Sequence, residues 1–124
     1  MRLLLDTHVL LWWLADDAAL PSAFRDVIAD PGNDVLVSAV SLGEVAIKAS
    51  LGKLRIPEEF WDAVDSSGFE ALPFGGHHAR ELLTLPWHHR DPFDRMLIAQ
   101  ARVEQLRLAS VDAACRRYDV LLLG

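Results

Sequence analysis

Short apolar runs alternate along the chain with longer segments in which apolar residues recur at helical spacing. The apolar runs are three or four residues long and mostly leucine or valine, which is typical of buried strands. They lie at residues 3–5, 35–37, 69–72, 108–111 and 120–123. The longer segments predict helices at residues 8–15, 21–29, 41–51, 57–64, 77–85 and 92–105.

Prolines and glycines mark the borders of these segments. Pro31 and Gly32 end the second helix, Gly52 ends the third, and Pro92 occupies the first position of the longest. Strands that alternate with helices predict the α/β fold class, with a short, mostly parallel central sheet. Helices cover both faces of such a sheet, so we expect its strands to be buried.

The composition is that of one folded domain, residues 1–124. Apolar residues make up 52% of the 124 residues and charged residues 24%, which argues against a disordered chain. The one cysteine, Cys115, excludes an intrachain disulfide framework. No apolar run approaches the ~20 residues that cross a bilayer. Asp6 also comes too early for a signal peptide, so we expect a cytoplasmic protein without membrane contact.

The net charge of −6 argues against a protein that coats nucleic acid nonspecifically, because affinity for phosphate comes from lysine and arginine. The same charge is compatible with an enzyme that holds a cation in an acidic cleft. Such an enzyme would bind phosphate through that cation.

Acidic residues fall at the edge where a parallel sheet binds ligands, beyond the carboxyl ends of its strands. Asp6 and Asp112 each directly follow a predicted strand. Glu44 and Asp94 each lie in the first turn of a predicted helix, and Asp91 just precedes the second of these helices. These positions are scattered in sequence but converge at one end of the predicted fold.

Each acid also has a purely structural interpretation as a helix cap. Ser41 and Glu44 have the spacing of a capping box, and Asp91 precedes a proline at the first helical position. Asp6 and Asp112 precede helical segments. A cluster favours a cation instead, because two carboxylates ~4 Å apart repel by roughly 4 kcal/mol at an effective dielectric constant of ~20. Oxygen ligands alone suit Mg²⁺ or Mn²⁺.

Several segments together resemble PIN-domain proteins, and among them the VapC toxins of bacterial toxin–antitoxin pairs. The most specific segment is His-Arg-Asp-Pro-Phe-Asp-Arg at residues 89–95, which is typical of one branch of these toxins. The resemblance runs through residues 4–12, 38–48, 52–54, 89–101 and 110–112. It implies a three-layer α/β/α fold, an acidic pocket for Mg²⁺ or Mn²⁺, and endoribonuclease activity.

The resemblance also assigns roles to the acids. Asp6, Glu44, Asp94 and Asp112 would be the catalytic metal ligands, with Asp91 as an additional candidate. A metal-activated water would then hydrolyse the RNA phosphodiester bond and leave a 5′-phosphate and a 3′-hydroxyl. We expect no histidine among the ligands, because neighbouring histidines on a helix do not face the same way.

Other side chains are candidates for binding RNA or protein. Arg95 and Lys48 are candidate substrate contacts, and Ser110 matches a position that supports the site; the alternative is a solvated face with salt bridges. Trp12 and Trp13 follow one another on a helix, so one of them is expected at an interface unless both lie in the core. The resemblance implies two such interfaces, a homodimer and a cognate VapB-type antitoxin.

Rival functions fit the residues less well. A haloacid-dehalogenase-like enzyme would need a second aspartate two residues after the first, where this chain has His8. A receiver domain would need a lysine after a late strand, where this chain has Asp112. The remaining alternative is a catalytically silent PIN-fold scaffold that binds RNA or protein, and the presence of all four acids favours catalysis over it.

Overall fold

Five parallel strands form the centre of the molecule in the computed structural model, which describes residues 1–123. Their order is β3-β2-β1-β4-β5, so the first strand of the chain is the central one. The strands are β1 (Arg2–Leu5), β2 (Asp34–Ser38), β3 (Glu70–Leu72), β4 (Arg107–Ala109) and β5 (Leu122–Leu123). Every pairing between neighbours is parallel, which confirms the predicted α/β class.

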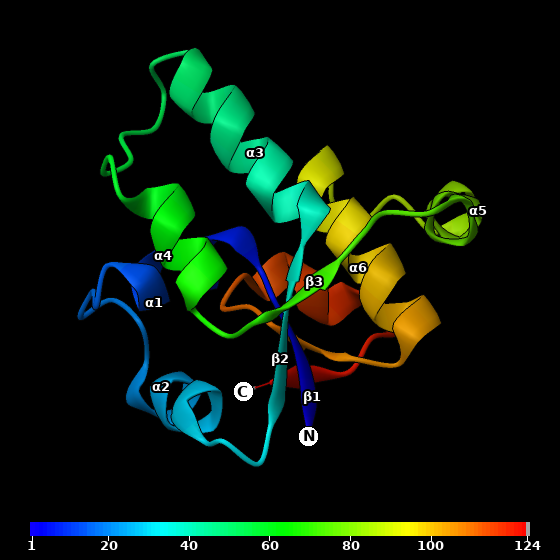
Figure 1. Ribbon diagram of the computed structural model, residues 1–124. Helices are drawn as coiled ribbons and strands as arrows, with labels where there is room; N and C mark the ends of the chain where they lie inside the picture. The colour runs from blue at the N-terminus through cyan, green and yellow to red at the C-terminus, as the bar shows by residue number, and fades with distance from the viewer. Residues whose placement is uncertain (124) are drawn as a thin grey trace.

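Helices cover both faces of this sheet. They are α1 (Thr7–Leu14), α2 (Ser22–Ala29), α3 (Ala39–Ser50), α4 (Phe60–Ser66), α5 (Gly76–Thr84) and α6 (Pro92–Glu104), with a short 3₁₀ helix at Ala113–Arg117. In Figure 1 the sheet is seen nearly edge-on, with α1, α2 and α4 on the left and α5 and α6 on the right. The arrangement is the expected three-layer α/β/α sandwich.

Residues of β1 alternate between two hydrophobic layers. Leu4 packs into the layer beneath α6, whereas Leu3 and Leu5 pack into the layer beneath α1 and α2. All three side chains are fully buried. A strand buried on both faces needs a continuous apolar run rather than an alternating one, which explains the leucine run at the start of the chain.

The start of α3 differs from the sequence prediction. The helix begins at Ala39 rather than Ser41, because Ser38 is its N-cap and accepts a hydrogen bond from the backbone N–H of Val40 (3.0 Å). The serine hydroxyl at the end of β2 therefore opens the helix at once. This shift moves Glu44 along the helix.

Two further boundaries differ. The strand β4 ends at Ala109, so Asp112 follows it by three residues rather than directly. The reason is a turn in which the Ser110 hydroxyl accepts from the backbone N–H of Asp112 (3.1 Å). The helix α4 begins at Phe60, because Pro57 opens a turn closed by the Phe60 N–H (3.0 Å) and not the helix itself.

The longest helix, α6, carries a cluster of titratable side chains at each end. It begins after Asp91 with Pro92 in the first position, as predicted. It ends at Gln105, which adopts the left-handed conformation with φ of 55° and donates its backbone N–H to Ala101. Among residues 1–123, no helix combines the length and the apolar character that crossing a membrane requires.

Candidate metal centre

The carboxyl ends of β1 and β4 lie side by side where the strand order reverses. The chain leaves β1 to add β2 and β3 on one side, and later adds β4 and β5 on the other. Leu5 of β1 pairs with Ala109 of β4, and the backbone N–H of Asp6 donates to the Ala109 carbonyl (3.1 Å). Asp6 therefore stands at the crevice in which open parallel sheets bind ligands.

Three of the acids cap helices, each through one carboxylate oxygen. Oδ1 of Asp6 accepts from the backbone N–H of Val9 (2.8 Å), and Oδ1 of Asp112 accepts from that of Ala114 (2.9 Å). Oδ1 of Asp91 caps α6 in the same way. A cap fixes the direction of the carboxylate and uses one of its two oxygens. The capping and ligand interpretations of these acids are therefore compatible.

His89 lies between two of the acids. Its Nε2 is 2.9 Å from Oδ2 of Asp94 and 3.6 Å from Oδ2 of Asp112. One atom from each of these three side chains lies within 4.8 Å of the other two, close enough for all three to hold one ion. Sequence reasoning missed His89 because a loop residue five positions before Asp94 carries no periodic signal. The 89–95 motif was the only pointer to it.

Burial makes the acids of this site hard to ionise. The pKa of Asp94 is raised to about 6, mainly by burial and also by repulsion from Asp91 and Asp6, while the hydrogen bond with His89 opposes the rise. Burial also raises the pKa of Asp6, which is 5% exposed, against a hydrogen bond with Ser110. A cation bound at this point would lower the pKa of both Asp94 and Asp6, because it stabilises the ionised carboxylates.

Glu44 is buried on α3, but it lies in a different turn of the helix from the one predicted from the sequence. Since the helix starts at Ala39, Glu44 lies in the second turn, and the capping box predicted with Ser41 does not form. Instead, the Thr7 hydroxyl donates to Oε1 of Glu44 (2.6 Å), and Lys48 Nζ lies 2.5 Å from Oε2. Thr7 directly follows Asp6, so this contact links Glu44 to the edge of β1.

Lys48 connects Glu44 with the acids of α6. The hydrogen bond to Glu44 is the largest cause of its raised pKa, and the negative charges of Asp91 and Asp94 raise it further. Its side chain is half-buried and paired with Glu44. Lys48 therefore offsets part of the negative charge of the pocket, and its contact with substrate stays a prediction.

Arg95, the other candidate contact to RNA, is buried. Its side chain is 3% exposed, and its guanidinium donates to the Pro86 carbonyl (2.7 Å) and the Tyr118 hydroxyl (3.0 Å). The guanidinium also lies over the Trp87 ring, 3.7 Å from its centre. The prediction of a substrate contact is therefore wrong: Arg95 lies one turn before the buried Ile98 and shares its inward face.

Ser110 lies beneath the site rather than on its surface. It is 8% exposed, accepts from the backbone N–H of Asp112 (3.1 Å) and hydrogen-bonds to Asp6. The residue thus joins two acids that follow different strands. Its buried position favours the supporting role over a direct contact with substrate.

Trp12 and Trp13 have different surroundings. Trp13 packs against Phe69, with ring centres 6.2 Å apart. Trp12 lies near His8 and lines an apolar groove of about 430 Å³ between α1 and α4, whose opposite wall includes Phe60. Both rings are partly buried against the layer beneath α1. Only Trp12 borders an open groove.

A second cluster lies at the other end of α6. Nε2 of His77 and Nε2 of His78 lie 3.2 Å and 3.0 Å from the same oxygen of Glu104. These neighbours on α5 therefore face the same carboxylate, with their rings 3.9 Å apart, contrary to the expectation that neighbouring histidines on a helix face different ways. The backbone N–H of Gly75 donates to Nδ1 of His78 (2.9 Å), so that ring carries its proton on Nε2 and donates to Glu104.

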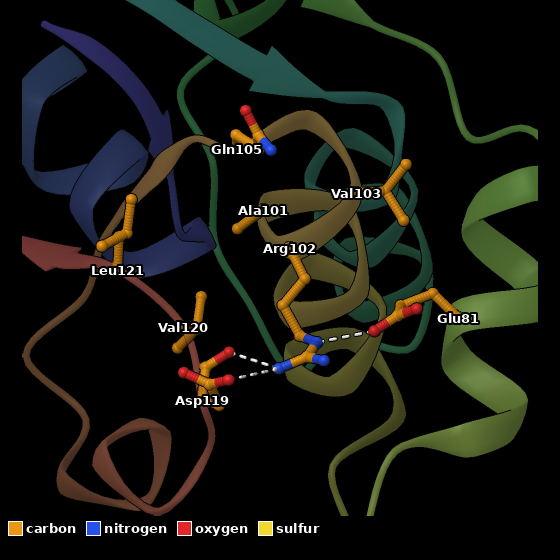
Figure 2. Close-up of a pocket in the computed structure, with 8 residues that line it drawn as sticks. All are labelled: Glu81, Ala101, Arg102, Val103, Gln105, Asp119, Val120 and Leu121. Carbon is orange, nitrogen blue, oxygen red and sulfur yellow. Dashed lines mark hydrogen bonds and ion pairs between the residues drawn. The ribbon is translucent and has the colours of Figure 1, made fainter.

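A hollow of about 650 Å³ lies beside the last turns of α6, and its charged groups are already paired. Figure 2 shows Arg102 between Glu81 and Asp119. Its Nε is 2.6 Å from Glu81, and its Nη1 is 3.7 Å from the Asp119 carboxylate. None of the acids singled out from the sequence lines this hollow.

The donors at the carboxyl edge of β1 and β4 fit a divalent cation. Asp94 and Asp112 lie within reach of one ion, Asp6 is near enough for its charge to interact with both of them, and Glu44 is held by Thr7, the residue after Asp6. Mg²⁺ and Mn²⁺ prefer oxygen donors of this kind. The crowding of partly buried carboxylates is the feature that a cation would stabilise.

A family model described as PIN domain matches residues 3–121. No curated protein gives a sequence match. A VapBC2 structure from Rickettsia felis, bound to a promoter DNA fragment, has a TM-score of 0.74 at 16% identity. The similarity covers 100% of this chain and 98% of that one.

Two further solved structures are similar. A DNA-bound VapBC from Salmonella typhimurium has a TM-score of 0.74 at 17% identity, covering 100% of this chain and 97% of that one. FitAcB from Neisseria gonorrhoeae has a TM-score of 0.67 at 17% identity, covering 98% and 96%. At such identities the likeness shows a shared fold over the whole length of the chain.

Proposed function

The chain belongs to the PIN-domain family, and from this we propose that it is a metal-dependent endoribonuclease of the VapC type. It would be the toxin of a VapBC toxin–antitoxin pair and hydrolyse RNA phosphodiester bonds. We take residues 1–124 as a single PIN domain. One observation carries the proposal: partly buried acids from separate segments meet where the strand order reverses, with the pKa of Asp94 raised to about 6.

Such crowding destabilises the protein unless a cation is bound, so the arrangement supports a ligand-binding role over a structural one. Capping alone would explain Asp6, Asp91 and Asp112 singly. It does not explain why Asp94, which caps nothing, stands beside them and Glu44 is buried nearby.

A Mg²⁺ or Mn²⁺ ion bound there would lower the pKa of a water molecule and stabilise charge on the scissile phosphate. Asp6 and Asp94 are the proposed direct ligands, and Glu44 and Asp112 complete the site directly or through water. The caps on Asp6 and Asp112 orient two of these carboxylates before any ligand arrives. Hydrolysis by water leaves a 5′-phosphate and a 3′-hydroxyl, without attack by the ribose 2′-hydroxyl.

Lys48 is the proposed contact to the RNA backbone. Its half-exposed ammonium lies beside the acids, where a phosphate approaching the site would pass. A cation at the rim is needed because the chain has a net charge of −6, which repels RNA at longer range.

The proposed protein partner is a VapB-type antitoxin. The groove beside Trp12 is mostly apolar and open, and none of the four proposed catalytic acids lines it, so an apolar segment of the antitoxin could bind there. The similar structures from Rickettsia felis and Salmonella typhimurium are VapBC complexes, which supports this kind of partner. We also propose a homodimer, on the resemblance to this family.

Cleavage of total cellular RNA by the purified, antitoxin-free chain tests the proposal. We expect discrete cuts with Mg²⁺ or Mn²⁺, none with excess EDTA, and 5′-phosphate ends at the cut sites. Asp6→Asn should abolish the cuts, whereas Asp26→Asn, the same exchange at an exposed position of α2, should leave them unchanged. A 2′,3′-cyclic phosphate at the product ends would contradict the mechanism.

The alternative is a catalytically silent PIN-fold scaffold that binds RNA or protein. A folded preparation that binds RNA, fails to cut it with either ion and takes up no Mn²⁺ would favour this scaffold. Cuts that persist in Asp6→Asn would instead reveal a contaminating nuclease.

A further inference from the structure

The His89 ring stands close to the position that a metal ligand would occupy. Neighbouring ligands of an octahedral ion with bonds of about 2.1 Å lie about 3 Å apart. The distance from Nε2 of His89 to Oδ2 of Asp94 is 2.9 Å, and the distance to Oδ2 of Asp112 is 3.6 Å. Oδ1 of Asp112 is used in the cap of Ala114, so Oδ2 is the oxygen that faces the ring.

The ring can present Nε2 to an ion by moving its proton to the other nitrogen. In the metal-free structure Nε2 donates to Oδ2 of Asp94, whereas no group among residues 1–123 is hydrogen-bonded to Nδ1 of His89. The proton can therefore move to Nδ1 when an ion takes its place between the ring and the carboxylate. His78 is the opposite case, because its Nδ1 accepts from Gly75 and its proton therefore sits on Nε2. The two clusters share residue types, but the bond from Gly75 fixes the proton of His78 on Nε2, whereas no such bond fixes the proton of His89.

The protein holds the loop that carries His89 in one place. The backbone N–H groups of His88 and His89 both donate to the Tyr118 hydroxyl, at 3.1 Å and 3.0 Å. Arg95 donates to the same hydroxyl and to the carbonyl of Pro86 in that loop. Buried contacts of this kind orient a ligand in advance, which a freely moving surface histidine lacks.

From this geometry we propose that His89 is a nitrogen ligand of the metal site and gives it a preference for Mn²⁺ over Mg²⁺. Imidazole suits transition-metal ions, whereas Mg²⁺ favours oxygen donors, so one nitrogen in a carboxylate site shifts the selectivity. The inference rests on the metal site of the proposed function. It revises the expectation from sequence that no histidine is a ligand.

The test measures metal binding without RNA. Calorimetry gives the Mn²⁺ and Mg²⁺ dissociation constants, and pulsed EPR of bound Mn²⁺ detects coupling to a ¹⁴N nucleus. The proteins are the wild type, His89→Ala, His89→Gln and the control His88→Ala at the exposed neighbouring histidine. Circular dichroism confirms that each variant is folded.

We expect ¹⁴N coupling in the wild type and in His88→Ala, and none in either His89 variant. Mn²⁺ affinity should fall about tenfold in His89→Ala, with a smaller change for Mg²⁺. His89→Gln, which offers an oxygen in place of the nitrogen, should recover binding while losing selectivity for Mn²⁺.

Two results would overturn the inference. A rise in Mn²⁺ affinity in His89→Ala would mean that the ring is a counter-ion that the metal displaces. Binding of Mn²⁺ to the wild type without ¹⁴N coupling would equally exclude the ligand role. In both cases metal-dependent RNA cleavage by the wild type would leave the proposed function standing, whereas a wild type that binds no Mn²⁺ and cuts no RNA would remove both.

Discussion

The two ends of α6 carry similar side chains but hold their charges in opposite ways. At the first turn, burial and neighbouring acids raise the pKa of Asp94 to about 6. At the last turn, hydrogen bonds with His78 and His77 lower the pKa of Glu104. The helix dipole alone would give the reverse order, because it stabilises negative charge at the N-terminus and destabilises it at the C-terminus.

The comparison shows that local partners outweigh the dipole. The carboxylate at the C-terminal end is hydrogen-bonded to two imidazoles and remains partly exposed, so its ionised form is stabilised within the protein. The carboxylate at the N-terminal end shares one imidazole with Asp112 and is repelled by Asp6 and Asp91. The second arrangement, in which an ionised carboxylate is disfavoured, is the one typical of a functional site.

The largest expected difference between the two ends is catalytic. Asp94→Asn should lower the initial rate of RNA cleavage about a thousandfold, because it removes a proposed metal ligand and a negative charge. Glu104→Gln, at the other end of the same helix, should change the rate by less than about twofold, since it touches no reacting group. Similar losses in the two variants would mean that the clusters act as one site.

The two arginines of α6 give the next contrast. Arg95→Ala should lower the free energy of unfolding by about 3 kcal/mol, because it removes the donor to the Leu85 and Pro86 carbonyls and one of the donors to the Tyr118 hydroxyl. Arg102→Ala should cost about 1 kcal/mol, since this side chain is partly exposed to solvent. Urea titrations of the two variants measure both values, and equal losses would contradict the burial argument.

Removing the charge of Asp94 should stabilise the metal-free protein. The pKa of Asp94 rises from 3.8 to about 6 on folding, so its contribution to stability is present below pH 3.8 and lost as the pH rises through about 6. A rise of about two pKa units corresponds to about 3 kcal/mol, so Asp94→Asn should gain up to about 3 kcal/mol at pH 7.5 in EDTA, and the gain should vanish near pH 4. Thermal unfolding measured across this pH range checks the prediction. Saturating Mn²⁺ should make the wild type more stable than Asp94→Asn, because only the wild type gains free energy from binding the ion.

The smallest expected effect belongs to Glu104, with the opposite dependence on pH. Its pKa is lowered from 4.5, so its contribution is present above pH 4.5 and lost as the pH falls through the folded value. Glu104→Gln should lose about 0.5 kcal/mol at pH 6, a modest figure because solvent screens the pair, and the loss should shrink in acid. The same series of thermal unfolding experiments measures this loss. A loss that grows as the pH falls would show that the two histidines do not stabilise the ionised Glu104 carboxylate.

The sheet was predictable because its strands are buried on both faces. The leucines of β1 form a continuous apolar run, as expected of a strand that is covered on both faces. The positions that follow such runs pointed to the acidic residues of the site. The start of α3 was not predictable, because Ser38 and Ser41 are equally good caps by residue type. The strand β2 stays paired as far as Ser38, which pairs with Leu72 of β3, so the helix begins directly after Ser38. A pairing between such distant segments cannot be read from the local sequence.

The surroundings of Arg95 and His89 were not predictable, for a related reason. The sequence made Arg95 a candidate contact to RNA or part of a solvated face, yet its helical spacing from Ile98 and its hydrogen bond to the distant Tyr118 turn it inward. The place of His89 depends on the same tyrosine, Tyr118, which lies 29 residues further along the chain. Long-range anchors of loops leave no local trace in the sequence.

The places of the groove and of the acids along the chain also set an order of events during synthesis. The groove beside Trp12 is built from residues 8 to 63, while the site needs Asp94 and Asp112 as well. At about 5–20 residues per second, Asp112 is added roughly 2–10 s after the last groove residue. A partner that recognises this groove could thus engage the nascent chain before the ribosome has finished a complete set of acids, and a product truncated before residue 112 would lack one of them.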